Sequence, residues 1–132
     1  MKSRIMYIEL KSGQSDKGPA WIGKVDFSKS GNTIYFNGLA FKKMTGTAFA
    51  YSDSANYYDL ENREGYWISG IKKNGQDRHW AGGGKIMIDR NIVDEYLKLV
   101  DFDTLDPNNF ELVDIKPTDK KKFVELENQN IE

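Results

Sequence analysis

The sequence contains no cysteine and only one histidine among its 132 residues. Without cysteine, disulfides, thiol nucleophiles and cysteine-based metal centres are excluded. A single histidine argues against a zinc site, so we expect neither a metal nor another cofactor. No apolar run approaches the roughly 20 residues of a membrane-spanning helix, and the start of the chain lacks the apolar core of a secretory signal. We therefore expect a cytoplasmic protein without a membrane partner.

Charge is nearly balanced over the whole chain but is unevenly distributed along it. The 19 Lys+Arg and 20 Asp+Glu give a formal net charge of -1. Residues 1–100 hold 15 basic against 11 acidic residues, whereas residues 101–132 hold 4 against 9. Fourteen of the 17 aromatic residues also lie before residue 101. We therefore predict a small β-rich domain over residues 1–100 and an acidic C-terminal extension over residues 101–132, whose order the sequence leaves open.

The clearest local pattern is a hairpin around Asn37-Gly38, which separates two short apolar segments. Asn-Gly accepts the positive φ angles of a type I′ turn. A two-residue loop pairs its flanking positions in order, so we expect Phe36 opposite Leu39. Two positions further along, Ile34 should face Phe41. All four side chains then share one face, and the turn chemistry agrees with the hydrophobic pattern.

Strand patterns dominate the rest of the first hundred residues. Strands are expected over residues 5–10, 21–28, 33–36, 39–42, 55–60, 66–71 and 85–88. From Asp89 the apolar residues follow helical spacing, and Asp89 is suited to cap that helix. The predicted fold is mainly β, a small antiparallel curled sheet or an SH3-like barrel with one helix near residues 90–100. Residues 110–115 and 122–126 remain open between further strands, a second short helix and disorder.

One segment, residues 66–80, concentrates aromatic and basic side chains around the Asn74-Gly75 turn. Its candidate ligand-binding residues are Trp67, Lys72, Lys73, Arg78, His79 and Trp80. Cations for phosphate and aromatic rings for base stacking would suit a nucleic acid or a phosphorylated ligand. The alternative is a hairpin with one core face and a solvated basic tip. Lys72 and Lys73 would point to opposite faces of a continuous strand, and only a turn beginning at Lys73 would bring them together.

Patterns of catalysis are weak throughout the chain. Residues 82–85, Gly-Gly-Gly-Lys, lack the Ser or Thr and the following helix of a Walker A phosphate loop. His79 with Asp77 or Asp89 offers acid–base groups, but no activated nucleophile accompanies them. Asp59 flanks a predicted hairpin tip, where solvated side chains are the norm. We therefore expect a non-catalytic protein with no catalytic residue.

Two longer motifs mark a resemblance. Residues 27–35 follow the pattern F-S-K-x-G-x-T-x-Y, and residues 66–78 follow Y-W-I-S-G-x-x-K-x-G-x-D-R. In this order they resemble a group of small, uncharacterised bacterial proteins over roughly residues 4–88. The resemblance implies no catalytic or binding residue. Similar sequences sometimes carry the label 1-deoxy-xylulose-5-phosphate synthase, but that enzyme class is several times longer and needs a Gly-Asp-Gly motif, which this chain lacks.

Two functions follow as hypotheses. The first is a small non-catalytic protein-interaction module, whose acidic extension supplements or masks the binding surface. The second is nucleic-acid or phosphorylated-ligand binding through Lys72, Lys73, Arg78 and the aromatic residues near them. The near-neutral net charge argues against strong nonspecific nucleic-acid binding, so a protein partner is the first expectation.

Overall fold

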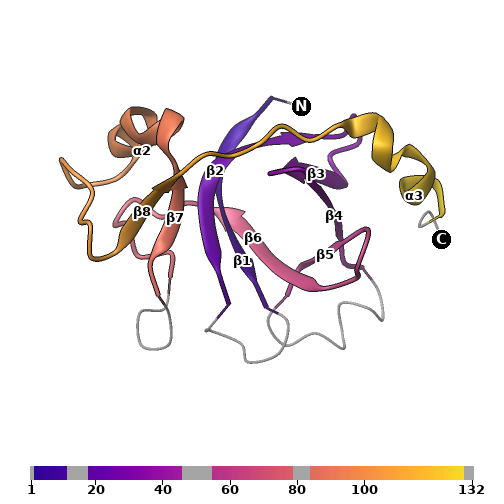
Figure 1. Cartoon of the computed structure of the whole chain (residues 1–132), viewed down its shortest axis with the longest axis horizontal. Coiled ribbons are helices and arrows are strands. Elements are labelled where there is room, and N and C mark those ends of the chain that lie inside the picture. The colour runs from indigo at the N-terminus through magenta and orange to yellow at the C-terminus, as the bar shows by residue number, and fades with distance from the viewer. Residues whose placement is uncertain (1, 12–17, 46–54, 79–83, 130–132) are drawn as a thin grey trace.

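The computed structural model describes residues 2–11, 18–45, 55–78 and 84–129, and strands dominate it (Figure 1). The strands are β1 (Arg4–Leu10), β2 (Ala20–Phe27), β3 (Thr33–Phe36), β4 (Leu39–Lys43), β5 (Tyr57–Asp59), β6 (Gly65–Gly70), β7 (Ile86–Asp89) and β8 (Phe110–Val113). Within the described residues, α2 (Val93–Leu99) and α3 (Val124–Gln129) continue the short 3-10 helices Arg90–Ile92 and Lys120–Phe123. The predicted mainly β fold and the predicted helix near residues 90–100 are confirmed.

Six strands close into an antiparallel barrel. They follow one another in the order β1-β6-β5-β4-β3-β2, and the pairing of β2 with β1 completes the ring. Because alternate side chains of each strand point inwards, apolar residues such as Ile8, Ile34 and Ile68 fill the interior. Gly23 faces Phe36 in this interior, where an added Cβ would lie 2.6 Å from the ring. The barrel is therefore a packed core rather than an open channel.

The Asn37-Gly38 hairpin has the predicted register. Phe36 pairs with Leu39, and Ile34 pairs with Phe41. Asn37 has a φ of 52° and Gly38 a φ of 78°, as a type I′ turn requires. All four side chains belong to the barrel core. This part of the prediction is confirmed because both the turn and the pattern are local properties of the sequence.

The last two strands pair in parallel, which differs from the prediction for β7, whereas β8 lies in the segment 110–115 that the sequence left open. β7 pairs parallel to β2, and β8 pairs parallel to β7. A parallel pair needs a crossover, and α2 supplies it between β7 and β8. The predicted helix cap is confirmed, because the backbone N–H of Asn91 donates to Asp89 Oδ1 at 3.0 Å. The expectation of purely antiparallel strands is wrong for β7 because strand patterns do not encode strand direction.

The outer wall of the barrel is covered at two places. Under α2, residues of β1, β2, β7 and β8 form a second apolar cluster with the buried Tyr96. Near the C-terminal end, Tyr35, Ala40 and Leu60 pack against Phe123, which is 0% exposed. Figure 1 shows α2 and α3 at opposite ends of the molecule, with the barrel between them.

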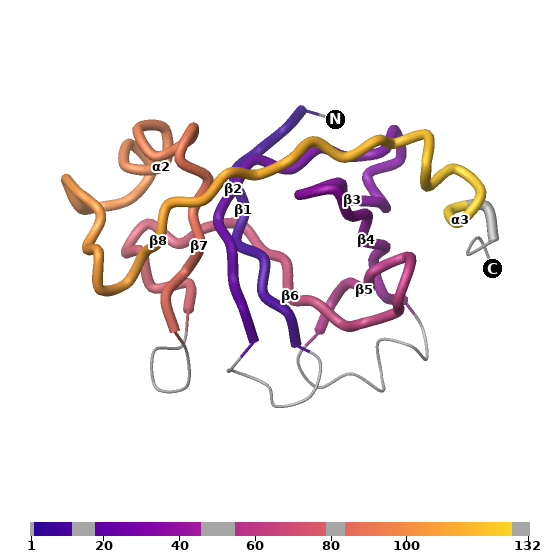
Figure 2. The backbone as a smooth tube through the Cα atoms, viewed as in Figure 1, coloured from indigo at the N-terminus to yellow at the C-terminus, as the bar shows by residue number. Residues whose placement is uncertain are grey.

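The segment that joins β8 to α3 runs across one end of the barrel (Figure 2). We call residues 114–119 the strap. The backbone N–H of Lys116 donates to Asn37 Oδ1 at 3.2 Å, and Thr118 Oγ1 donates to the carbonyl oxygen of Leu39 at 3.2 Å. Ile115 packs against the barrel core. Much of the acidic extension therefore packs on the barrel. That residues 1–100 form a domain of their own stays a prediction. No helix in the described part of the chain is long and apolar enough to cross a membrane.

Candidate functional site

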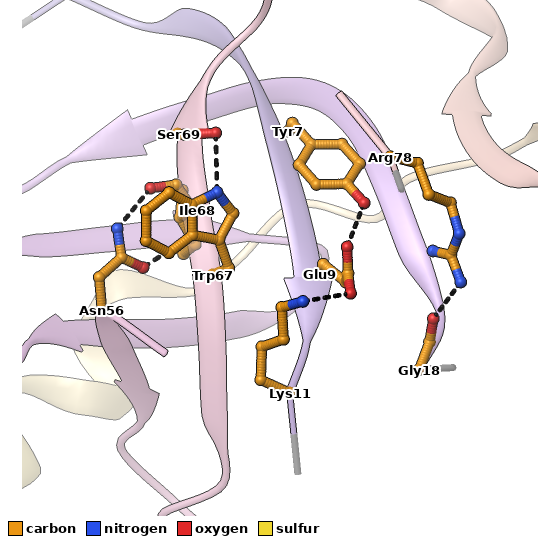
Figure 3. Close-up of polar contacts among 9 residues, drawn as sticks. All are labelled: Tyr7, Glu9, Lys11, Gly18, Asn56, Trp67, Ile68, Ser69 and Arg78. Atoms are coloured by element: carbon orange, nitrogen blue, oxygen red, sulfur yellow. Dashed lines mark hydrogen bonds and ion pairs between the residues drawn. The ribbon is translucent and has the colours of Figure 1, made fainter. Parts of the chain in front are cut away.

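Trp67 lies on the outer wall of the barrel. Its neighbours Tyr66 and Ile68 point into the core and are buried, whereas Trp67 is 39% exposed. The indole N–H donates to Ser69 Oγ at 3.1 Å, which fixes the ring orientation along β6 (Figure 3). Across the strand pair Trp67 is opposite Glu9. Of the six predicted binding residues, Trp67 is a well-placed exposed aromatic side chain.

Lys72 and Lys73 lie in a turn, because β6 ends at Gly70. The sheet partners of β6 are β1 and β5, and no described residue after Gly70 pairs with β6, so the predicted hairpin around Asn74-Gly75 is wrong. Both side chains are exposed. The carbonyl oxygen of Lys72 accepts from the N–H of Gly75 at 3.0 Å, and that of Lys73 accepts from the N–H of Asp101 at 2.8 Å. The strand alternation that would separate the two lysines does not extend to them. Their backbone is fixed by the turn and by its contact with the C-terminal extension.

Arg78 points inwards, unlike the two lysines. It is only 4% exposed, and its Nη2 donates to the carbonyl oxygen of Gly18 at 2.7 Å. A buried guanidinium cannot meet a ligand on the same exposed surface as Lys72 and Lys73. His79 and Trp80 lie outside the described residues. The structure therefore does not bring Arg78 together with the predicted basic tip.

A buried polar cluster lies beside Arg78 on the outer wall (Figure 3). The hydroxyl of Tyr7 donates to Glu9 Oε1, and Lys11 Nζ lies 2.7 Å from Glu9 Oε2. Burial, together with the hydrogen bond to Glu9, raises the pKa of Tyr7 far above its usual value, so the hydroxyl stays a donor. The carboxylate of Glu9 thus has its partners within the fold, on Tyr7 and Lys11.

The carboxylates considered for acid–base chemistry accept backbone hydrogen bonds. Asp77 Oδ1 accepts from the N–H of Lys72 at 2.9 Å, and Asp89 caps the helix. Burial nevertheless raises the pKa of Asp77, against the opposing effects of that hydrogen bond and of the Lys72 charge. Asp59 accepts from the N–H of Glu61 at 2.7 Å and is 1% exposed, so the expectation of a solvated Asp59 is wrong. The turn after Asp59 leaves backbone N–H groups without strand partners, and the Asp59 carboxylate accepts hydrogen bonds from them.

A second site, absent from the sequence prediction, lies between the β2–β3 turn and α3. We call it the lysine groove. It is lined by Ser28, Lys29, Tyr35, Lys42, Lys120 and Glu127, among other residues, and offers about 720 Å³. Its three lysines come from three different segments of the chain. Within the described part of the chain, none of these three lysines forms an ion pair.

The β2–β3 turn presents Lys29 to this groove. The N–H of Ser28 donates to the carbonyl oxygen of Thr33 at 2.9 Å, and the N–H of Thr33 donates back to Ser28 Oγ at 3.2 Å. Gly31 has a φ of 80°, which allows the chain to reverse between them. Lys29 is therefore exposed on a turn held by its own backbone.

Tyr35 connects the groove with the C-terminal segment. Lys120 Nζ lies 5.3 Å from the centre of the Tyr35 ring, and the hydroxyl donates to Glu127 Oε1 at 2.5 Å. Burial and this hydrogen bond raise the pKa of Tyr35 well above its usual value. The hydroxyl therefore remains a hydrogen-bond donor at neutral pH. The groove combines three cations, hydroxyl donors and one carboxylate that is already engaged.

Comparison of the chain with protein-family models, with curated proteins and with solved structures found no match. Among the described residues, no group of three or more His, Asp or Glu side chains could hold a metal ion. A candidate site is therefore argued from the positions, burial and contacts of this chain's own residues.

The sequence contained only part of the signal for the lysine groove. Lys29 lies within the F-S-K-x-G-x-T-x-Y motif, whose turn could have been recognised from Gly31. Lys120 opens a run of three lysines directly after Asp119, which caps the 3-10 helix through the N–H of Lys121. Nothing local shows that these segments meet, because the contact joins positions 92 residues apart. Tertiary structure alone defines this site.

Proposed function

We propose that this chain is a small, non-catalytic binding module for a phosphate-bearing small ligand, held in the lysine groove. The observation that carries the proposal is the convergence of Lys29, Lys42 and Lys120 on one groove without a carboxylate partner among the described residues. Like charges repel one another, so such a convergence favours an anionic occupant.

The chemistry of the lining suits a phosphate group. Lysine ammonium groups are strong donors to phosphate oxygens, and hydrogen bonds to charged groups are stronger than neutral ones. The hydroxyls of Ser28 and Tyr35 add neutral donors at the same place. The volume of about 720 Å³ falls in the range of roughly 300–1,000 Å³ that is typical of small-molecule sites. A compact anion fits this arrangement better than an extended polymer.

The 66–78 segment supports phosphate binding less well. Lys72 and Lys73 are exposed, but Arg78 is buried and engaged with Gly18. A nucleic-acid surface needs cations that follow the phosphate backbone over several nucleotides. Two lysines on a turn do not provide such a track. We therefore prefer the lysine groove over the 66–78 segment and a small ligand over a nucleic acid.

A titration with pyrophosphate at low ionic strength, followed by amide NMR shifts, tests the proposal. We expect saturable shifts at Lys29, Asn32 and Lys42. The double variant Lys29→Gln/Lys42→Gln should weaken binding about tenfold or more, since hydrogen bonds to charged groups are strong. The matched control, Lys72→Gln/Lys73→Gln, removes the same charge from the turn after β6 and should leave the Kd within about twofold of the wild type.

Three results would overturn the proposal. The first is the absence of saturable binding. The second is an equal loss of affinity in the Lys72→Gln/Lys73→Gln control. The third is a single-stranded oligonucleotide that binds far more tightly than pyrophosphate with a steep salt dependence, because this would favour the nucleic-acid function.

Trp67 favours protein interaction as a second candidate function. Tryptophan is enriched at binding hot spots, and this one is exposed, with its indole N–H already held by Ser69. A photo-crosslinking amino acid at position 67 should capture one defined protein in cells, and the same group at the exposed position 63 should not. An excess of the wild-type chain should abolish the capture, whereas an excess of the Trp67→Ala variant should not. Equal capture from both positions would reject this function.

A further inference from the structure

One carboxylate lies among the cations of the lysine groove, and it belongs to the C-terminal helix. Glu127 accepts a hydrogen bond from the Tyr35 hydroxyl at 2.5 Å. The groove lining includes this side chain together with Lys29, Lys42 and Lys120. An internal carboxylate thus lines the same groove in which the proposed function puts an external anion.

The C-terminal segment is built to hold this carboxylate in place. Phe123 is fully buried against Tyr35, Ala40 and Leu60, and Leu126 packs against the same cluster. Lys120, Val124 and Glu127 line the groove instead. Their spacing of four and three residues places them on one face of a helix. One face therefore anchors the segment while the other contributes to the site.

We propose that Glu127 is an intramolecular competitor that occupies the anion position of the lysine groove until a phosphate-bearing ligand displaces it. This inference rests on the proposed function. A tethered carboxylate is present at high effective concentration, so it sets a threshold that the ligand must exceed. The Tyr35 hydroxyl is a single donor that serves either Glu127 or the ligand.

The sign of the effect follows from electrostatics. The charge of Glu127 repels an incoming phosphate and offsets part of the positive potential of the three lysines, although it forms no direct ion pair with them among the described residues. A phosphate group carries more charge than one carboxylate and offers more acceptor oxygens, so it can win this competition. Removal of the charge should therefore increase affinity, whereas removal of a groove cation should decrease it.

The test compares Glu127→Gln with Glu125→Gln in the full chain, using pyrophosphate as the probe. Gln keeps a carbonyl oxygen that can accept from Tyr35, so α3 should stay docked. Glu125 is exposed on the same helix and does not line the groove, so this control has the same change in net charge. We expect about five- to tenfold tighter binding for Glu127→Gln and less than about twofold change for Glu125→Gln.

The outcomes separate the two proposals. If the wild type and Glu127→Gln both fail to bind, the proposed function itself fails. If the wild type binds and Glu127→Gln binds equally well, only the competitor role is rejected. Similar gains in both variants would indicate a general charge effect and would also reject it. If Glu127→Gln loosens α3, NMR will show lost contacts between Phe123 and Tyr35. In that case Glu127→Met is the second variant, because it fills the same space without charge. If neither variant binds pyrophosphate more tightly than the wild type, the inference is contradicted.

Discussion

The segment of residues 66–78 and the lysine groove concentrate basic residues in opposite ways. In the 66–78 segment the basic residues are close in sequence, but Arg78 is turned into the wall while Lys72 and Lys73 face solvent. In the groove the lysines are far apart in sequence but line one hollow. Proximity in sequence therefore predicted more basic side chains on the first surface than the structure places there, and it did not predict the second site.

The two regions also differ in what their charged groups do. Asp77 and Arg78 satisfy backbone groups of Lys72 and Gly18, so they contribute to folding. Lys29 and Lys42 have no ion-pair partner among the described residues, so their charge is available to a ligand. Substitutions in the two regions should accordingly affect different observables: stability for the 66–78 segment and binding for the groove.

The largest expected effect concerns the anchor of the groove-forming segment. Phe123→Ala removes a fully buried ring and should lower the free energy of unfolding by about 3–5 kcal/mol. Val124→Ala, on the 53% exposed neighbour, should change it by less than about 0.5 kcal/mol. Urea unfolding measures both values. Equal effects would show that the C-terminal segment is not part of the cooperative fold.

A second prediction separates the basic residues of the 66–78 segment. Arg78→Ala removes a buried guanidinium and its bond to Gly18, and should destabilise the fold by about 1–3 kcal/mol. Lys72→Ala should cost less than about 0.5 kcal/mol, since its side chain is exposed. Thermal and urea unfolding of the two variants check this ranking. A neutral Arg78→Ala variant would contradict the structural role of Arg78.

The smallest expected effect is the pH dependence due to Asp77. Burial raises its pKa in the folded state, so the folded protein holds this proton more tightly than the unfolded chain does. This contribution to stability is therefore complete below the ordinary aspartate pKa of about 4 and decreases as pH rises through the window above it. Asp77→Asn should remove this decrease. We expect the unfolding free energy of the wild type, relative to that of the variant, to decrease from acidic to neutral pH. A difference that does not change with pH would contradict this prediction.

Local physics explains which parts of the fold were predictable. The Asn37-Gly38 turn, the strand segments and the Asp89 cap depend on residues close in sequence, and all three were found from the sequence. The parallel pairing of β7 and the docking of Phe123 depend on long-range contacts, which strand patterns do not encode.

The candidate sites follow the same rule. Exposure of Trp67 and Lys72 agrees with the alternation and the turn, whereas burial of Arg78 requires the carbonyl of Gly18, 60 residues away. The lysine groove exists only once α3 is docked beside the β2–β3 turn. Its lysines were visible in the sequence, but their convergence was not.

The ratio of pyrophosphate affinities between the two double variants tests the central comparison most directly. The Kd of Lys29→Gln/Lys42→Gln, divided by that of Lys72→Gln/Lys73→Gln, should be about ten or more, since only the first pair lines the groove. A ratio near one, or a ratio below one, would contradict the assignment of binding to the lysine groove.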